Sequence, residues 1–299
     1  MTPKTIAVAG ASGLIASATL PRLEAAGWNV VRLVRKPARH AGERSWDPTA
    51  ETAGLFEGCQ AVLNLAGHSI ADWPWTRSTR RKILESRLAA TSTLAKAAKA
   101  QGVETFVNGS AIGYYGNQAD RELPESSPAG TGFLAEVCQA WERALSPLAS
   151  SATRTVVLRT GIVLASRGGS LPPQWNASRR GLGAILGYGS QWISWIQLED
   201  VSRAIAHLLA DPRLHGPVNL CAPNPVRQRE FAGALDMAVG RKTRLRAPSW
   251  VLRTLLGKFA DELLLASQRG VPTALTESGF TWEFPRIHDA LGRLRSEFA

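Results

Sequence analysis

A glycine-rich segment close to the start of the chain has the composition of a phosphate-binding turn. Gly10, Ser12 and Gly13 follow an apolar run that predicts a strand, and Leu14 and Ile15 open a stretch of helical period. Glycine permits a tight turn and a close approach of the main chain, and the free N–H groups of a helix start donate hydrogen bonds to anions. Because a strand is predicted before the segment and a helix after it, the motif predicts binding of the pyrophosphate of a dinucleotide.

The residues that follow the second predicted strand indicate which dinucleotide would bind. NAD-binding chains have an Asp or Glu about 20 residues beyond the glycine turn, where it binds the ribose 2′-hydroxyl. This sequence has no acid at that point, and Arg35 and Lys36 stand in its place. A guanidinium fork suits a 2′-phosphate. The segment therefore predicts NADP as the cofactor; the alternative is that both residues are solvated surface charges.

Several short β-branched segments alternate with longer segments, rich in Ala and Leu, that have helical period. Strands are predicted at residues 6–9, 29–34, 61–65, 105–108 and 154–159, and helices at residues 14–26, 78–101 and 134–148. Strands separated by helices of this length form βαβ units with parallel strands. Because such crossovers are right-handed, the pattern predicts an α/β fold with a Rossmann-like, doubly wound parallel sheet.

The composition changes after about residue 161. Gly, Pro and Trp become more frequent, a short strand-like stretch occurs at residues 218–220, and two or three helices are predicted to follow it. We therefore predict an NADP-binding Rossmann domain over residues 1–165 and a smaller α/β substrate lobe over residues 166–299.

Motifs spread over nearly the whole chain resemble an extended short-chain dehydrogenase/reductase. Besides the glycine turn, they are Trp46-Asp47-Pro48, Asn64-Leu65-Ala66-Gly67, Trp75-Thr76, Ser86-Arg87, Ser110-Ala111-Ile112-Gly113-Tyr114-Tyr115-Gly116, Phe133-Leu134-Ala135, Trp141-Glu142, Arg159-Thr160-Gly161 and Gln191-Trp192-Ile193-Ser194-Trp195. More narrowly, the chain is similar to an atypical branch described as sugar-nucleotide epimerases. Residues 248–296 resemble the small helical C-terminal domain that is peculiar to this branch.

The resemblance implies cofactor contacts beyond the glycine turn. Leu65, Ala66 and Gly67 would line the ribose and adenine side of the cofactor. Arg87, on the long helix, and Val163, after the sixth strand, would be further contacts. For Arg87 the alternative is an exposed helix charge or a surface ion pair, which contributes only ~0–1 kcal/mol.

The acid–base pair of the wider superfamily is missing from this chain. Its members use a Tyr followed four residues later by a Lys, which lowers the pKa of the phenol. None of the three tyrosines has that Lys, and Phe133 and Val137 stand where the pair is expected. The catalytic candidates that remain are Ser110, Tyr114 and Tyr115, although the sequence indicates no activating partner for them. For both tyrosines the alternative is aromatic packing with a satisfied hydroxyl.

The substrate is expected in a cleft between the two lobes. Its wall would include Trp75, Gly113, Gln191 and Trp195, and the basic C-terminal lobe suits an anionic substrate such as a nucleotide sugar. Asp200 is expected to be a helix N-cap. A small-molecule substrate and a homodimer are the partners that we expect.

Composition excludes several other classes of protein. The chain has 299 residues and is 44% hydrophobic. No apolar run approaches the ~18 residues of a membrane span, and the N-terminus shows no signal peptide. The three cysteines form no C-x-x-C pair, which argues against a disulfide scaffold and favours a reducing cytoplasm. The histidines lack ligand spacing, so no metal site is predicted.

The net charge of +11 is also compatible with a nucleic-acid-binding protein. Residues 228–241 have a faint helix-turn-helix cadence, but this arises wherever two short amphipathic helices meet at a glycine. The basic residues between Arg227 and Lys258 receive no role. The sequence thus predicts an NADP-dependent oxidoreductase or epimerase; a non-catalytic NADP-binding sensor is the alternative, and nucleic-acid binding ranks third.

Overall fold

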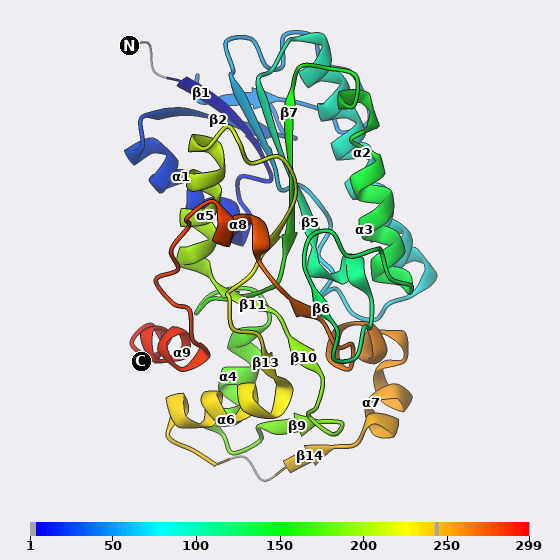
Figure 1. The fold of residues 1–299 in the computed structure, drawn as a ribbon. Helices are drawn as coiled ribbons and strands as arrows, with labels where there is room; N and C mark the ends of the chain where they lie inside the picture. Colours follow the sequence, from blue (N-terminus) through cyan, green and yellow to red (C-terminus); the bar gives the residue numbers. More distant parts are fainter. Residues whose placement is uncertain (1–3, 243–244, 299) are drawn as a thin grey trace. The chain divides into compact units, whose positions relative to one another are not determined.

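The computed structural model describes residues 4–242 and 245–298 (Figure 1). By its internal contacts the chain divides into two compact units that alternate along the sequence. Unit 1 consists of Met1–Ser110, Val137–Arg159 and Ser202–Val218, and unit 2 of Ala111–Glu136, Thr160–Val201 and Asn219–Ala299. The linear domain boundary at residue 165 stays a prediction.

A seven-stranded sheet takes its strands from residues 4–220, with the strand order β12-β7-β5-β4-β1-β2-β3. The strands are β1 (Lys4–Ala9), β2 (Trp28–Val34), β3 (Glu43–Ser45), β4 (Ala61–Asn64), β5 (Thr105–Ala111), β7 (Arg154–Thr160) and β12 (Gly216–Leu220). β1 pairs in parallel with both β2 and β4, so the strand order reverses there. In sheets of this kind ligands bind at the carboxyl ends of the strands beside such a reversal. The predicted Rossmann-like α/β fold is confirmed.

Helices cover both faces of this sheet, as its buried strands require. They are α1 (Leu14–Ala25), α2 (Arg77–Ala100), α3 (Phe133–Arg143) and α5 (Leu198–Ala210). In Figure 1, α2 and α3 lie on one face and α1 and α5 on the other. Val62 and Phe106 from the sheet share a fully buried apolar cluster with Leu94 and Ala98 from α2. This packing holds the strand ends, and the loops that follow them, in fixed positions.

Two features of the sheet differ from the expectation. The short edge strand β3 was not predicted, because three residues carry little periodic signal. The strand predicted at 218–220 forms the end of β12, whose place next to β7 at the other edge of the sheet the sequence does not predict. The predicted third helix also ends earlier, at Arg143, and a short 3₁₀ helix (Ser146–Leu148) follows it.

Unit 2 is built from short strands and helices. Its elements are a 3₁₀ helix (Ile112–Tyr115), β6 (Glu122–Leu123), β8 (Ile162–Leu164), α4 (Leu171–Arg179), β9 (Ala184–Leu186), β10 (Trp192–Ile193), β11 (Trp195–Gln197), β13 (Val226–Arg227), α6 (Gln228–Val239), β14 (Leu245–Ala247), α7 (Ser249–Leu256), a π-helix (Ala260–Leu264), β15 (Arg269–Gly270), α8 (Thr273–Glu277) and α9 (Ile287–Arg295). The strands pair two by two, β10 with β13, β11 with β8, β14 with β9 and β15 with β6. Trp175, Trp195, Phe231 and Leu291 belong to its apolar core.

The segment with the helix-turn-helix cadence forms a single core helix. α6 buries Phe231 and Leu235 and ends before Gly240, which has φ 70°. In the described part of the chain the next element is strand β14, so α6 is not followed by a recognition helix. No helix among the residues that the structure describes has the length and apolar character needed to cross a membrane.

Candidate functional site

The turn after β1 is shaped by Gly10, which has φ 76°. A Cβ atom on Gly10 would lie 2.7 Å from the carbonyl oxygen of Leu65, the residue that follows β4. The N–H of Gly13 donates to the oxygen of Gly10 at 2.9 Å and closes the turn. Only glycine fits at this point, and its absence of a side chain brings the loop after β1 against the loop after β4.

The first turn of helix α1 has backbone N–H groups that are not capped. Its N-cap is Gly13, which offers no side-chain cap, and the first turn contains no acidic residue. Within the described residues, the amides of Leu14, Ile15 and Ala16 have no hydrogen-bond acceptor. Ser12 and Gly13 are exposed. A helix start with free donors and a positive dipole fits a phosphate group, as the sequence predicted for this segment.

Arg35 and Lys36 follow β2 directly, at the carboxyl end of the strand beside β1. Both are exposed, and neither forms an ion pair with any residue that the structure describes. Ser45 fastens their loop, because its hydroxyl donates to the oxygen of Lys36 at 3.0 Å and accepts from the N–H of Ala38 at 2.8 Å. The loop that carries Arg35 and Lys36 is therefore anchored, and no carboxylate of the described residues neutralises either side chain.

Arg87 lies against the glycine of the loop after β4. A Cβ atom on Gly67 would come within 3.2 Å of Cγ and Cζ of Arg87. The guanidinium Nη1 donates to the carbonyl oxygens of His68 and Ile83 at 2.8 and 2.9 Å. Burial lowers the pKa of Arg87, and nearby Cys138 acts in the opposite direction.

This environment differs from both alternatives raised for Arg87, an exposed helix charge and a surface ion pair. The side chain is half-buried, and within the described chain its guanidinium donates to carbonyl oxygens rather than to a carboxylate. A guanidinium that has lost water without gaining a counter-ion is well suited to an anionic ligand.

A buried polar network ties the ends of β4 and β5 to the helices on one face of the sheet. The side-chain amide of Asn64 donates to Asn108 Oδ1 at 2.7 Å and to Thr91 Oγ1 at 3.0 Å. Trp141 Nε1 also donates to Thr91 Oγ1, at 2.8 Å. The indole packs on Gly109, where a Cβ would lie 3.1 Å from the ring, and Arg87 Cζ lies 4.9 Å from the ring centroid. Trp141 thus links the Arg87 site to the end of β5.

The last residue of unit 1 on β5, Ser110, has a defined partner. It is 5% exposed, and its hydroxyl donates to Glu142 Oε1 at 2.7 Å. Arg159 Nε donates to the same oxygen at 3.0 Å, and Nη2 donates to Glu142 Oε2 at 2.9 Å. The forked ion pair compensates the charge of the carboxylate and fixes its orientation. The proton of Ser110 is directed at Glu142, which leaves the oxygen lone pairs able to accept a hydrogen bond.

Glu142 and Arg159 are the residues that sequence reasoning missed. Both stand in motifs that support the resemblance, but neither received a role. The signal was present in Arg159, since a charged residue after three buried apolar residues of a strand requires a counter-charge. Which acid supplies it depends on the packing of α3 against the sheet, and no local pattern encodes that.

The start of α3, the helix that carries Glu142, is capped from a distant segment. Glu262 accepts hydrogen bonds from the N–H groups of Phe133 and Leu134, at 2.7 and 3.0 Å. A carboxylate at a helix N-terminus satisfies free amides and complements the helix dipole. Glu262 therefore stabilises the beginning of this helix.

The structure does not support Tyr115 as a catalytic candidate. Its side chain is fully buried, and its hydroxyl donates to Asn219 Oδ1 at 2.9 Å, with the oxygen of Pro124 at 3.3 Å. This is the packing role with a satisfied hydroxyl that the sequence left open. Tyr114 is half-buried and packs edge-on against Tyr115, with ring centroids 5.3 Å apart. A catalytic role of Tyr114 stays a prediction.

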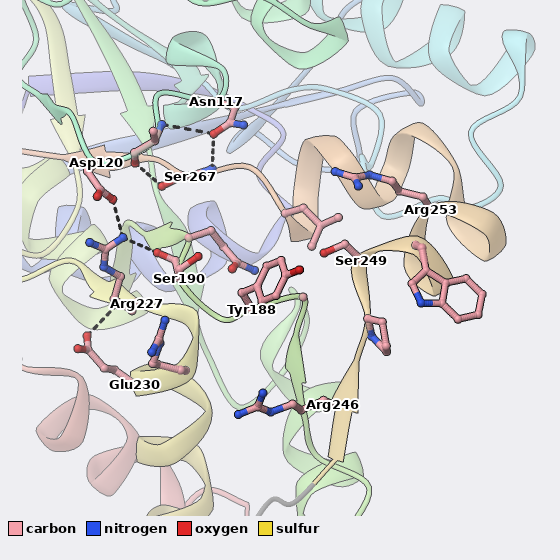
Figure 2. Close-up of a pocket in the computed structure, with 17 residues that line it drawn as sticks. Asn117, Asp120, Tyr188, Ser190, Arg227, Glu230, Arg246, Ser249, Arg253 and Ser267 are labelled. Carbon is pink, nitrogen blue, oxygen red and sulfur yellow. Dashed lines mark hydrogen bonds and ion pairs between the residues drawn. The ribbon is translucent and has the colours of Figure 1, made fainter.

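The four residues expected in the substrate wall are distributed over both units. Trp75 belongs to unit 1 and donates its Nε1 proton to the oxygen of Ile70 at 2.9 Å. Gly113 is buried in the 3₁₀ helix of unit 2. Trp195 is fully buried in the core of unit 2, so its expected place in a substrate wall is wrong. Gln191 lines a cavity of unit 2, together with the residues labelled in Figure 2.

Two further expectations concern unit 2. Asp200 is not an N-cap, because α5 already begins at Leu198. Its carboxylate oxygens instead accept hydrogen bonds from the N–H groups of Glu283 and Phe284, both at 2.9 Å. Val163 lies on β8, opposite Ile196 of β11. Its contact with a cofactor stays a prediction.

The sheet order and the glycine turn define a protein of the Rossmann-like α/β class, and comparisons with known proteins narrow that class. Residues 6–221 match the NAD dependent epimerase/dehydratase family, and residues 247–294 match a domain of unknown function, DUF1731. The chain therefore belongs to the NAD dependent epimerase/dehydratase family, which confirms the resemblance.

Individual relatives cover nearly the whole chain. An epimerase family protein of Mycobacterium bovis is 43% identical over 297 residues, which is 98% of this chain and 98% of the relative. The human epimerase family protein SDR39U1 is 33% identical and covers 96% of this chain and 98% of its own length. The crystal structure of human SDR39U1 (isoform 2) with NADPH has a TM-score of 0.90 at 30% identity, covering 98% of this chain and 99% of that chain.

Proposed function

We propose that this protein binds NADP and transfers hydride between the cofactor and a small-molecule substrate, as an oxidoreductase or an epimerase. The glycine turn and the free amides of Leu14 and Ile15 would hold the pyrophosphate. Arg35 and Lys36 would bind the 2′-phosphate, and Arg87 would contribute a further cation on the Gly67 side. The similarity to a human relative whose structure was solved with NADPH supports this choice of cofactor.

The residues present fit the cofactor on physical grounds. Gly10 and Gly67 leave room where a side chain would collide with Leu65 or Arg87. The cations at the end of β2 have no carboxylate partner among the described residues, and β2 is not followed by the acid that would favour a free 2′-hydroxyl. When bound, NADP accepts a hydride from an alcohol carbon, and NADPH returns one to a carbonyl carbon.

Ser110 would handle the proton that accompanies this hydride. When a substrate alcohol is oxidised, its hydroxyl proton passes to Ser110 Oγ while the proton of Ser110 passes to Glu142, and the substrate becomes a carbonyl compound. In the direction of reduction the same protons return to the substrate oxygen. This route needs no tyrosine–lysine pair. The hydrogen bond of 2.7 Å from Ser110 to Glu142 carries the proposal.

Activity of Ser110 variants tests the proposal. The wild type, Ser110→Ala and Ser110→Thr are incubated with NADPH and a panel of ketones, aldehydes and nucleotide sugars, and both NADPH consumption and product isomers are followed. General acid–base catalysis contributes about 10²–10⁴-fold, so we expect Ser110→Ala to lower kcat by at least about 100-fold without changing the Kd for NADPH. Ser110→Thr, which keeps the hydroxyl, should recover part of the rate and the wild-type pH profile.

Two outcomes would overturn the catalytic role. An unchanged kcat in Ser110→Ala would exclude Ser110 as the proton-transfer residue. Tight NADPH binding without turnover of any compound would instead support the non-catalytic NADP sensor. Ser17→Ala is the matched control, because Ser17 is an exposed serine of α1 whose hydroxyl donates to the oxygen of Leu14 at 3.0 Å.

A further inference from the structure

Thr91, in the middle of α2, lies at the centre of the buried polar network at the ends of β4 and β5, and its side chain is fully buried. Its hydroxyl oxygen accepts hydrogen bonds from Asn64 Nδ2 at 3.0 Å and from Trp141 Nε1 at 2.8 Å. The hydroxyl proton is donated to Asn108 Oδ1 at 3.3 Å. Because a hydroxyl has one proton and two lone pairs, these three bonds use its full capacity and fix its orientation.

The partner that Thr91 holds most closely, Trp141, supports the backbone beside Ser110. A Cβ atom on Gly109, the residue before Ser110, would lie 3.1 Å from both Cζ2 and Cη2 of the indole. Glu142, which accepts the proton of Ser110, follows Trp141 directly in α3. The orientation of one indole ring therefore affects both ends of the hydrogen bond between Ser110 and Glu142.

Thr91 also lies on the same face of α2 as Arg87, since residues four apart in a helix are neighbours on its surface. Arg87 Cζ is 4.9 Å from the centroid of the Trp141 ring. One helix face thus carries both the cation expected at the cofactor and the hydroxyl that orients the indole. All residues of this arrangement belong to unit 1.

The chemistry of the network favours a precise positioning role over simple packing. Polar groups lose hydration when they are buried, and an apolar pair of similar shape would fill the same space without that loss. A network whose members are all hydrogen-bonded instead specifies one arrangement of the elements it joins. Here it joins α2, α3 and the ends of β4 and β5 beside Ser110.

We propose that Thr91 is a positioning residue for proton transfer by Ser110. Through Trp141, its hydroxyl holds Ser110 Oγ and Glu142 Oε1 at their distance of 2.7 Å. Thr91 acts through the indole rather than on the reacting atoms, because its hydroxyl is buried and all of its hydrogen bonds are used. This inference rests on the proposed function, in which Ser110 handles the proton. A misplacement of about 1 Å in such a group can lower the rate about 100-fold.

A kinetic double-mutant cycle with Ser110→Ala tests the role of Thr91. Thr91→Val keeps the shape of the side chain and removes the hydroxyl, so we expect kcat to fall about tenfold or more while the Kd for NADPH changes less than about twofold. Thr91→Ser, which keeps the hydroxyl, should recover most of the rate. In the Ser110→Ala background Thr91→Val should cause no further loss, because residues that act as a unit are not additive.

Two further variants separate positioning from general damage to the helix. Thr93→Val is the matched control, because Thr93 is a half-buried threonine of α2 that donates to the oxygen of Pro48 at 2.7 Å, outside the network. It should leave kcat unchanged. Trp141→Phe keeps an aromatic ring and removes only the indole N–H, so it should repeat the effect of Thr91→Val. It tests the same hydrogen bond if Thr91→Val does not fold.

Crystal structures of the wild type and Thr91→Val with NADPH give a readout that does not depend on turnover. We expect the indole of Trp141 to rotate and the hydrogen bond between Ser110 and Glu142 to open in the variant. Three results would overturn the inference: wild-type kcat in Thr91→Val and Trp141→Phe, an equal loss in the presence and absence of Ser110, or an unchanged distance between Ser110 and Glu142 in the variant.

Failure of the proposed function gives a different result. A wild-type kcat in Ser110→Ala, or the absence of turnover in every variant, would contradict the role of Ser110 in proton transfer. The two crystal structures would still show whether the hydroxyl of Thr91 fixes the position of Ser110.

Discussion

The cluster at Ser110 and the cavity of unit 2 both depend on arginine, but they treat its charge in opposite ways. Arg159 is almost fully buried and forms a forked pair with Glu142. Arg229 and Arg246 are exposed at the cavity wall without a carboxylate partner in the described residues. A paired, buried arginine fixes the position of another group, here the acceptor of the Ser110 proton. An unpaired arginine on a concave wall is available for a ligand.

The same distinction holds within the proposed cofactor site. Arg35, Lys36 and Arg87 have no carboxylate partner among the residues described, and each follows or faces a strand end of the sheet. Arg44, which lies farther along the same region, is held by the carbonyl oxygens of Leu55 and Glu57, both at 2.8 Å. Arg44 thus braces a loop, and Arg87 is likewise held by two carbonyl oxygens. Arg35 and Lys36 keep exposed charges at the place where a phosphate is expected.

Breaking the buried ion pair between Arg159 and Glu142 should give the largest loss of stability. Removal of one partner of a buried ion pair costs about 3–5 kcal/mol, because the other charge remains buried without compensation. We expect Arg159→Leu to lower the free energy of unfolding by about that amount in chemical denaturation. In the exposed pair of Arg293 with Glu297, Arg293→Leu should cost only about 0.3–0.5 kcal/mol. Equal losses in the two variants would show that the Arg159 pair does not act as a buried ion pair.

The next largest effect is expected at the glycine turn. Gly10→Ala forces a side chain into a left-handed conformation, which costs about 1–2 kcal/mol, and into contact with Leu65 at 2.7 Å. Gly27→Ala is the control, because Gly27 has φ 85° and no atom within 4 Å of the added Cβ. Thermal unfolding should show a larger loss for Gly10→Ala, and NADPH binding should weaken in that variant alone. If the two variants behave alike, close approach at Gly10 is not what the turn requires.

The pH dependence of stability tests whether Asp120 and Arg227 form a stabilising ion pair. The hydrogen bond from Arg227 holds the pKa of Asp120 below its ordinary value of 3.8, and burial opposes this shift. A lowered folded-state pKa means that the pair stabilises the fold above the unfolded pKa and is lost as the pH falls through the lowered value. Wild type and Asp120→Asn should therefore converge in stability as the pH falls below about 3.8, the ordinary pKa.

The features that the sequence predicted correctly are those encoded by adjacent residues. The glycine turn, with strand β1 before it and helix α1 after it, and the strand β2 depend on local backbone needs and on periodicity. The partnership of Ser110 with Glu142 and Arg159 joins residues on β5, α3 and β7, so it appears only when the sheet and its helices are packed. The place of β12 next to β7 in the sheet is unpredicted for the same reason, since it follows from long-range topology.

Two tryptophans show a second limit of prediction from the sequence. The sequence predicts Trp195 for a binding wall and assigns no role to Trp250. In the structure Trp195 is fully buried and donates to the oxygen of Asn224 at 3.0 Å, whereas Trp250 is exposed at the cavity. Burial depends on what the remaining chain packs against each ring, and the local sequence does not contain that information.

The relative affinity for NADPH and NADH tests the central claim most directly. The two differ only in the 2′-phosphate, and hydrogen bonds to charged groups contribute about 1.5–3 kcal/mol, with each 1.4 kcal/mol equal to a tenfold change. In calorimetry the wild type should bind NADPH at least about tenfold more tightly than NADH, and Arg35→Ala should remove most of that preference. Equal affinities in the wild type, or a preference that persists in Arg35→Ala with Lys36→Ala, would contradict the account.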